Sequence, residues 1–446
     1  MRKTLFMLIT ILMISFLGLG IFTACGGNEE EQGEQTSFVF ETSEDGTFYT
    51  VTGYDGEETE VEIPSSYSEL PVKAISKHAF KGKTITKIVI PDSIETIGLG
   101  AFYNCTNLAN VSLGQGLTAI SGELFAGCSS LVEITIPNGV LTLGAKSFYS
   151  CTNLESVKLG SGLTEIGVEA FSKCTKLSSV EFSNGVTMIC RSAFSGCASL
   201  NNIVIPESVT TIEKEAFFGC NNLQNITING KLSYIGSRLF DGCHQSLYTE
   251  EESLVYTKLN GNPYALLNKN TNDSLYTYVI NENTEYVGTN VFANCKLLKN
   301  IIIPDSVTVI GDYCFNNCGS LKNVTIGSGV RIIGESAFAT CGSLESIVIP
   351  DNVERLGGAI FTNCSTLKDV KIGKGVKSIG PSAFYSCAVL EEIFIPINVE
   401  AMEGVAMFAD CYNLKKVYVE ASGKPSGWNR DWAHRCYGQI IWGHQG

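Results

Sequence analysis

One short motif returns along most of the chain at an almost constant interval, and this periodicity constrains the fold more than any other feature. Its marker is a phenylalanine, found at Phe80, Phe102, Phe125, Phe148, Phe171, Phe194, Phe217 and Phe240, and again at Phe292, Phe315, Phe338, Phe361, Phe384 and Phe408. Within each series the spacing is 23 residues, apart from one interval of 22 and one of 24. A period sustained over this length predicts one elongated unit built by stacking, in place of several separate domains.

A single repeat shows what each unit contributes. In the stretch from Leu131 to Pro137, Ile134 and Ile136 alternate with a residue that points the other way, as a short strand requires. Pro137, or Gly160 in the next repeat, ends the strand, and a short helical or irregular turn carries the phenylalanine. This predicts a leucine-rich-repeat solenoid, a right-handed superhelix of about fifteen coils with a continuous parallel β-sheet on one face.

The cysteines follow the same period. Thirteen of the 17 occupy one repeat position: Cys105, Cys128, Cys151, Cys174, Cys197, Cys220, Cys243, Cys295, Cys318, Cys341, Cys364, Cys387 and Cys411. Stacked coils point these side chains the same way, which does not suit the torsion of a disulfide. We therefore expect a column of buried free thiols, with disulfide pairs or a metal site as the alternatives. Cys190, Cys314 and Cys436 lie off this column, and packing is expected for them as well.

The N-terminus predicts export. Arg2 and Lys3 precede a largely apolar run from Leu5 to Phe22, followed by Thr23-Ala24-Cys25, which resembles a bacterial lipobox. The resemblance implies that the leader is cut before Cys25 and that this cysteine carries lipid, which would anchor the protein on the extracellular face of a bacterial membrane. An uncleaved membrane anchor is the alternative. The acidic residues that follow predict a flexible tether.

The interval between Phe240 and Phe292 is longer than two periods and predicts an inserted β-hairpin around Asn260-Gly261. The tyrosines of this hairpin, Tyr248, Tyr256 and Tyr264, are candidate ligand contacts. The alternative is that the hairpin only joins and supports the two halves of the solenoid. The predicted organisation is a signal peptide at 1–24, lipidated cysteine and tether at 25–37, N-terminal cap at 38–78, first block at 79–245, hairpin at 246–274, second block at 275–419 and C-terminal cap at 420–446.

The C-terminal cap holds all three tryptophans, Trp428, Trp432 and Trp442. Large aromatic side chains can hide the open core at the end of a solenoid. An exposed aromatic platform for carbohydrate is the alternative.

The outward position between the two core aliphatic residues of each strand is the candidate binding face. In the second block these residues are Val279, Ile302, Thr325, Val348, Lys371, Phe394 and Tyr418. In the first block the same position is mostly polar, as at Ser112, Thr135 and Lys158. An apolar stripe on one half of the sheet would mark an interaction site, although the preference of strands for valine and isoleucine could also produce it.

Several functional classes are disfavoured by composition. A formal net charge of −14 without a basic stripe argues against nucleic acid as a partner. The sequence has four histidines and no nucleophile motif, phosphate-binding loop or paired metal ligands, so we expect no enzyme activity, cofactor or metal.

The repeat consensus, Ile-Pro-x-x-Val-x-x-Ile-Gly-x-x-Ala-Phe-x-x-Cys-x-x-Leu-x-x-Val-x-Ile, resembles that of the BspA-like leucine-rich-repeat surface proteins over about residues 38–446. The resemblance implies an extracellular protein-binding or adhesion module for host or bacterial macromolecules, such as a matrix or plasma glycoprotein. We expect a monomer. The alternative is a structural envelope component or a ligand-capturing lipoprotein, but the latter would need a pocket between two lobes, whereas the repeats predict one open surface.

Overall fold

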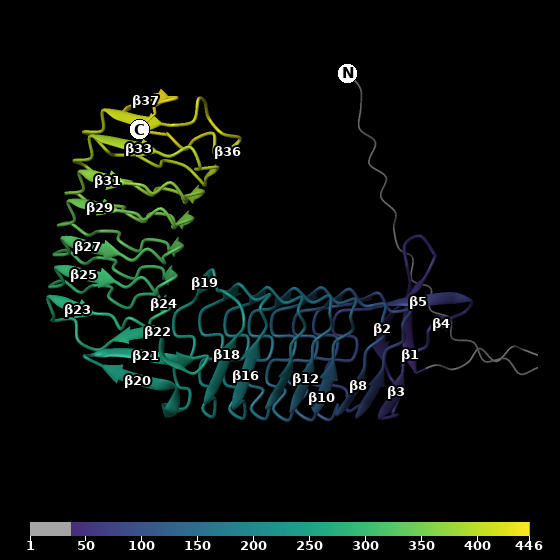
Figure 1. Ribbon diagram of the computed structural model, residues 1–446. Helices are drawn as coiled ribbons and strands as arrows, with labels where there is room; N and C mark the ends of the chain where they lie inside the picture. The colour runs from purple at the N-terminus through teal and green to yellow at the C-terminus, as the bar shows by residue number, and fades with distance from the viewer. Residues whose placement is uncertain (1–36, 446) are drawn as a thin grey trace, which may run out of the picture. The chain divides into compact units, whose positions relative to one another are not determined.

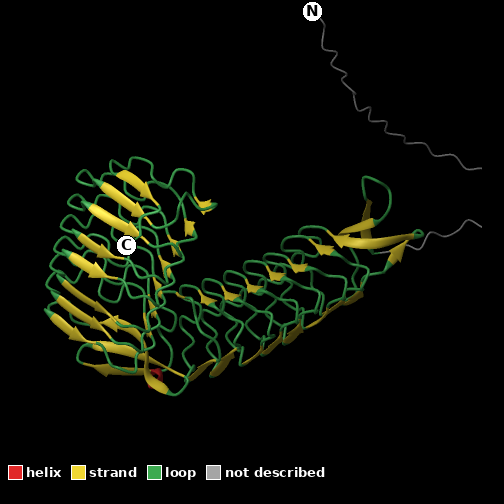
Figure 2. Cartoon of the chain, turned by 45° about the horizontal axis from the view of Figure 1, so that its top comes forward, coloured by secondary structure: helices red, strands yellow, loops and turns green. Residues whose placement is uncertain are grey.

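The computed structural model describes residues 37–445, which form short strands joined by turns. Within this range the one helical element is a 3-10 turn, Gln245–Leu247, near the middle of the chain (Figure 2). The described residues contain no helix that is both long and apolar enough to cross a bilayer.

Each coil contributes a strand of three or four residues to what we call the outer row. These strands are β3 (Glu60–Glu62), β6 (Lys87–Val89), β8 (Asn110–Ser112), β10 (Glu133–Thr135), β12 (Ser156–Lys158), β14 (Ser179–Glu181), β16 (Asn202–Ile205), β18 (Asn225–Ile228), β23 (Thr277–Val279), β25 (Asn300–Ile303), β27 (Asn323–Ile326), β29 (Ser346–Val348), β31 (Asp369–Lys371), β33 (Glu392–Ile395), β35 (Lys416–Val419) and β37 (Gln439–Trp442). Neighbouring strands pair in parallel one repeat apart, so that Ile134 lies beside Val157. The predicted solenoid with its period of about 23 residues is confirmed.

A second row of two-residue strands lies on the opposite side of the coils, and the sequence analysis did not predict it (Figure 1). Its members are β7 (Thr96–Ile97), β9 (Ala119–Ile120), β11 (Thr142–Leu143), β13 (Glu165–Ile166), β15 (Met188–Ile189), β17 (Thr211–Ile212), β19 (Tyr234–Ile235), β24 (Tyr286–Val287), β26 (Val309–Ile310), β28 (Ile332–Ile333), β30 (Arg355–Leu356), β32 (Ser378–Ile379), β34 (Ala401–Met402) and β36 (Gly427–Trp428). Hydrogen bonds between neighbouring strands of the second row are continuous over six strands in the first block and from β24 to β36 in the second. In the outer row they connect groups of only two or three strands. The solenoid therefore carries two parallel rows in place of a single continuous sheet.

The motif phenylalanines form a buried ladder through the core. Rings of successive coils stack with centroids 4.9 Å apart at the closest pair, Phe80 and Phe102, and 5.9 Å apart at the widest, Phe338 and Phe361. The turn that carries each ring is irregular, with left-handed residues on both sides, such as Ser336 (φ 52°) and Thr340 (φ 60°) around Phe338. The left-handed position two residues after each ring is mostly glycine or asparagine, which tolerate positive φ better than other residues do, and Thr340 is an exception.

The cysteine column stands beside the phenylalanine ladder. Twelve of its thirteen thiols donate to the carbonyl oxygen of a phenylalanine in an earlier coil, with Sγ–O distances of 2.9–3.4 Å. Every cysteine of residues 37–445 is a free thiol, and Cys190 and Cys314 are buried like most of the column. Packing is thus confirmed as the role of the column, while Cys25 lies outside the described residues.

Acidic and amide side chains after the outer strands connect one coil to the next. The Asp305 carboxylate accepts a hydrogen bond from the Ser328 amide at 2.6 Å, and Asp351 accepts from the Lys374 amide at 2.8 Å. Each contact spans 23 residues, so the Pro-Asp pair of the motif fixes the turn of the following coil.

The insertion between the two blocks is a three-stranded antiparallel meander of β20 (Tyr248–Glu251), β21 (Leu254–Leu259) and β22 (Asn262–Asn270). Asn260 and Gly261, both with positive φ, make the predicted turn between β21 and β22. Strand β22 then pairs in parallel with β24, which builds the insertion into the second row. The Asn260 side chain bonds the backbone amide and carbonyl of Ile228, and so joins the meander to the first block.

Aromatic side chains close both ends of the ladder. At the start, β1 (Phe38–Thr42), β2 (Tyr49–Tyr54), β4 (Ser66–Tyr67) and β5 (Leu70–Ile75) form a small sheet, and Tyr54 stacks on Phe80 at 5.7 Å. At the other end Trp432 packs against Phe408, and Trp428 donates its indole N–H to the Val399 carbonyl at 2.8 Å. Both tryptophans are buried, so the alternative of an exposed carbohydrate platform is wrong for them.

Candidate interaction surface

The seven residues predicted as a binding face lie on the outward side of the outer row in the second block. Strand pairing sets Val279 beside Ile302 and Ile302 beside Thr325. Farther along, Val348 pairs with Lys371 and Phe394 with Tyr418. The core residues that flank each outward side chain point inward, because side chains alternate along a strand.

Exposure is uneven along this row. Val279, Ile302 and Val348 are 68%, 65% and 57% exposed, which is high for aliphatic side chains. Phe394 and Tyr418 are only partly exposed, because the ring of His444 lies 4.3 Å from the Tyr418 ring and 6.3 Å from the Phe394 ring. The open apolar surface is therefore at the aliphatic residues of the row, and the C-terminal cap partly covers the aromatic ones.

A polar row runs beside the apolar one. The first residue of most of these strands is polar and also points outward, and the Asn323 amide donates to the Asn300 side-chain oxygen at 2.7 Å. Just before β23, the ring of Tyr276 is 54% exposed, with the Lys299 ammonium 4.7 Å from its centroid. An apolar strip with a polar edge has the composition of a protein interaction site. Tyr276 lies outside the alternating strand pattern, so the sequence analysis did not select it.

The same outward position in the first block is mostly polar or charged. Ser112 and Thr135 are exposed, and Lys158 pairs with Glu181 at 3.4 Å. Val204 is the exception, with an exposed fraction of 56%. The two blocks thus share one backbone pattern and differ in the chemistry of this surface.

The tyrosines of the insertion differ in their burial. Tyr256 is fully buried, and its hydroxyl accepts a hydrogen bond from the Asn281 amide at 3.1 Å. Tyr248 donates to the Phe240 carbonyl, while Tyr264 packs edge-on against Tyr256. The hypothesis of ligand contact is wrong for Tyr256, because its ring and hydroxyl are buried in the core, and it stays a prediction for the partly exposed Tyr248 and Tyr264.

Within residues 37–445, no group of three or more histidine, cysteine, aspartate or glutamate side chains is arranged to hold a metal ion. Burial raises the pKa of several column thiols, to about 11 for Cys105 and about 12 for Cys364, so those cysteines are poor nucleophiles.

Comparison with known families gives one extended match. The family described as "BspA type Leucine rich repeat region" matches residues 73–201, 142–258, 187–318 and 285–415, which together cover well over half of the chain. Among curated proteins, none matches the sequence significantly.

Solved structures of bacterial repeat proteins are also similar. A leucine-rich-repeat protein from Bacteroides ovatus shares 23% identity over 91% of this chain and 98% of its own, with a TM-score of 0.45. A leucine-rich cell-surface protein from Faecalibacterium prausnitzii shares 26% identity over 92% and 97%, with a TM-score of 0.40. The pneumococcal vaccine antigen PcpA shares 17% identity over 92% and 99%, with a TM-score of 0.33.

Proposed function

Because this chain belongs to the family of BspA-type leucine-rich-repeat proteins, we propose that it is a bacterial cell-surface module that binds a protein or glycoprotein. The observation that carries the proposal is the exposed apolar strip of Val279, Ile302 and Val348 on the outer row of the second block. Burying one such side chain in an interface contributes about 1.5–3 kcal/mol. Three of them with a polar edge provide enough free energy for a specific contact. The proposed role is non-enzymatic.

Attachment through a lipid on Cys25 is part of the proposal and is supported by the sequence alone, since this residue lies outside the described residues. The leader before Cys25 and the acidic residues after it are the features of a tethered lipoprotein. A tether would hold the solenoid away from the membrane, where its outer row can meet a macromolecule in the surroundings.

The test uses the chain from residue 38 onward, which forms one compact unit. Surface plasmon resonance against a panel of matrix and plasma glycoproteins should identify at least one partner. Replacing Ile302 by lysine should then weaken binding at least tenfold, because a charge would replace buried apolar area. Val204→Lys is the matched control, because Val204 has the same outward position and similar exposure in the first block.

Equal losses for Ile302→Lys and Val204→Lys would contradict the assignment of binding to the second block. If no member of the panel binds, the alternative of a structural envelope component gains support.

A further inference from the structure

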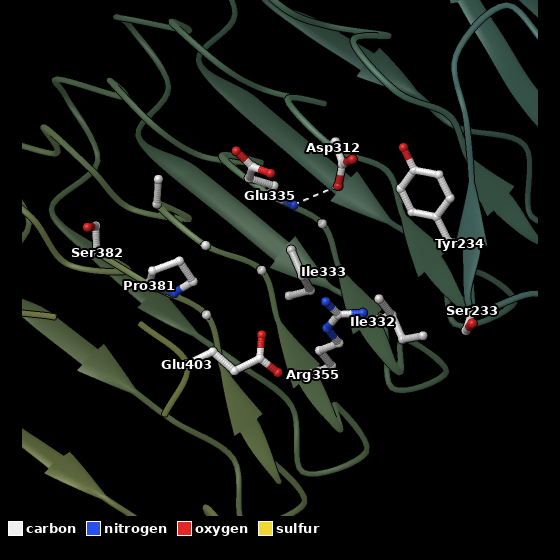
Figure 3. Close-up of a pocket in the computed structure, with 15 residues that line it drawn as sticks. Ser233, Tyr234, Asp312, Ile332, Ile333, Glu335, Arg355, Pro381, Ser382 and Glu403 are labelled. Atoms are coloured by element: carbon white, nitrogen blue, oxygen red, sulfur yellow. Dashed lines mark hydrogen bonds between the residues drawn. The ribbon is translucent and has the colours of Figure 1, made fainter. Parts of the chain in front are cut away.

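A cavity of about 430 Å³ lies where the last strand of the first block meets the second row of the second block. Tyr234, on β19, forms one side, and residues that follow β26, β28, β30, β32 and β34 form the other (Figure 3). The Thr289 hydroxyl donates to the Ile235 carbonyl at 3.2 Å, which fixes the two blocks against each other beside the cavity. The cavity therefore exists because the insertion interrupts the regular stacking.

At the end of the cavity formed by Tyr234 and Asp312, the polar groups of the lining are hydrogen-bonded to one another. The Asp312 carboxylate accepts a hydrogen bond from the Glu335 amide at 2.7 Å and another from the Tyr234 hydroxyl. Burial raises the pKa of Asp312, and burial beside this carboxylate raises the pKa of Tyr234 to about 12. These groups hold the tyrosine ring in a fixed position against the cavity.

Two charged, solvent-exposed side chains of the lining have no protein partner in the described part of the chain. Arg355 and Glu403 both line the cavity, and neither side chain forms a hydrogen bond or an ion pair within the described range 37–445, although the charge of Arg355 acts to lower the pKa of the Asp312 carboxyl. Arg355 lies on β30, beside the Ile332–Ile333 strand, and Glu403 follows β34, two strands farther along the row (Figure 3). By contrast, Arg331 on the preceding coil is paired with Glu354. The cavity thus presents a free donor group and a free acceptor group at the same time.

The lining also limits the charge of a ligand. Asp312, Glu335 and Glu403 outnumber Arg355 among the charged lining residues, so the lining disfavours an anion. A neutral hydroxyl group accepts from a guanidinium and donates to a carboxylate, so a ligand with several hydroxyls satisfies both Arg355 and Glu403. Apolar side chains are added to the lining by Ile332, Ile333, Ala359 and Pro381. The cavity volume falls within the range of small-molecule sites.

We propose that this cavity between the two blocks is a binding site for a neutral saccharide of one or two rings. Arg355 and Glu403 hold its hydroxyl groups, and the fixed ring of Tyr234 offers an apolar surface to one side of it. This site is separate from the outer row and does not depend on the binding of a protein there.

The experiment is isothermal titration calorimetry with the chain from residue 38 onward and a set of neutral mono- and disaccharides. Free glycine, lysine, glutamate and inorganic phosphate serve as charged probes. We expect at least one saccharide to bind and the charged probes to give no heat of binding. Arg355→Gln and Glu403→Gln should each weaken saccharide binding at least tenfold, because each removes a charge-assisted hydrogen bond.

Arg331→Gln is the matched control and should leave saccharide binding unchanged. Both site residues are exposed, and thermal unfolding should confirm that their variants fold normally. The proposal is overturned if no saccharide binds, if amino acids or phosphate bind instead, or if binding survives the Arg355→Gln and Glu403→Gln double variant. The Ile302→Lys variant should bind saccharide normally, which separates this site from the outer row.

Discussion

Replacing Phe338 by alanine should destabilise the solenoid more than any change on its surface. Phe338 is fully buried and stacks on Phe315 at 5.2 Å and on Phe361 at 5.9 Å. Removing a buried phenylalanine ring costs about 3–5 kcal/mol through lost transfer free energy and the cavity left behind. Each stacked pair contributes about 0.5–1.5 kcal/mol beyond its buried area, so we expect a loss near the upper end of that range. The coils before and after the one that contains Phe338 also lose stability, because each coil is stabilised by its neighbours.

Urea denaturation followed by circular dichroism measures this effect, and Phe394→Ala is the control. Phe394 is also a phenylalanine of the second block, but it is partly exposed on the outer row, so its replacement should change the free energy of unfolding by about 1 kcal/mol. A change in the denaturant slope of the Phe338 variant would indicate that the coils on either side unfold separately. Equal destabilisation by the two variants would refute the view that the ring ladder holds the coils together.

Three further predictions address the thiols, the anchor and the glycines. The native Cys105 thiol has a pKa of about 11 against an ordinary value of 9.0, so at pH 8 its thiolate fraction should be about a hundredfold smaller than that of an ordinary cysteine, and it should react correspondingly slowly with a thiol reagent. Denatured, unreduced protein should titrate most of its cysteines as free thiols. Near-complete oxidation of the cysteines would contradict their packing role. Cys25→Ser should release the protein from the membrane fraction of cells, and unchanged retention would favour an uncleaved anchor. Gly329→Ala should lower stability by about 1–3 kcal/mol in thermal or urea unfolding, because its Cβ would lie 1.9 Å from the Asp305 carbonyl oxygen, whereas Gly423→Ala, which has open space around it, should have little effect.

The periodic features of the fold could be predicted from the sequence because each is repeated many times. Ile134 and its equivalents face the core at every coil, so a wrong assignment of this position in one repeat is corrected by comparison with the other repeats. The thiol column followed from the same argument, and the structure supplies its acceptor, the phenylalanine carbonyl. The tryptophans of the C-terminal cap were predicted from the need to cover an open core.

Features that arise once in the chain were harder to predict. Strands of two residues, such as Arg355–Leu356, are too short to show alternation, so the second row gave no signal. The cover of His444 over Tyr418 depends on the path of the last residues, which no repeat specifies. The cavity beside Tyr234 is formed by segments on either side of the insertion, and the insertion length was its only trace in the sequence. The prediction of one open surface therefore missed it.

The constant register between coils also has a consequence for folding. The thiol–carbonyl contacts that link the coils join residues 25–27 positions apart, so the mean sequence separation of contacts does not grow with the number of coils. A chain of this length can then fold through local steps, each like that of a much smaller protein. The contact between Thr289 and Ile235 spans 54 residues, and closing that longer loop adds roughly 0.8 kcal/mol relative to one period. Because this increment is small, a solenoid can accept an inserted segment in the middle of its stack, and with it a cavity that an uninterrupted array would not contain.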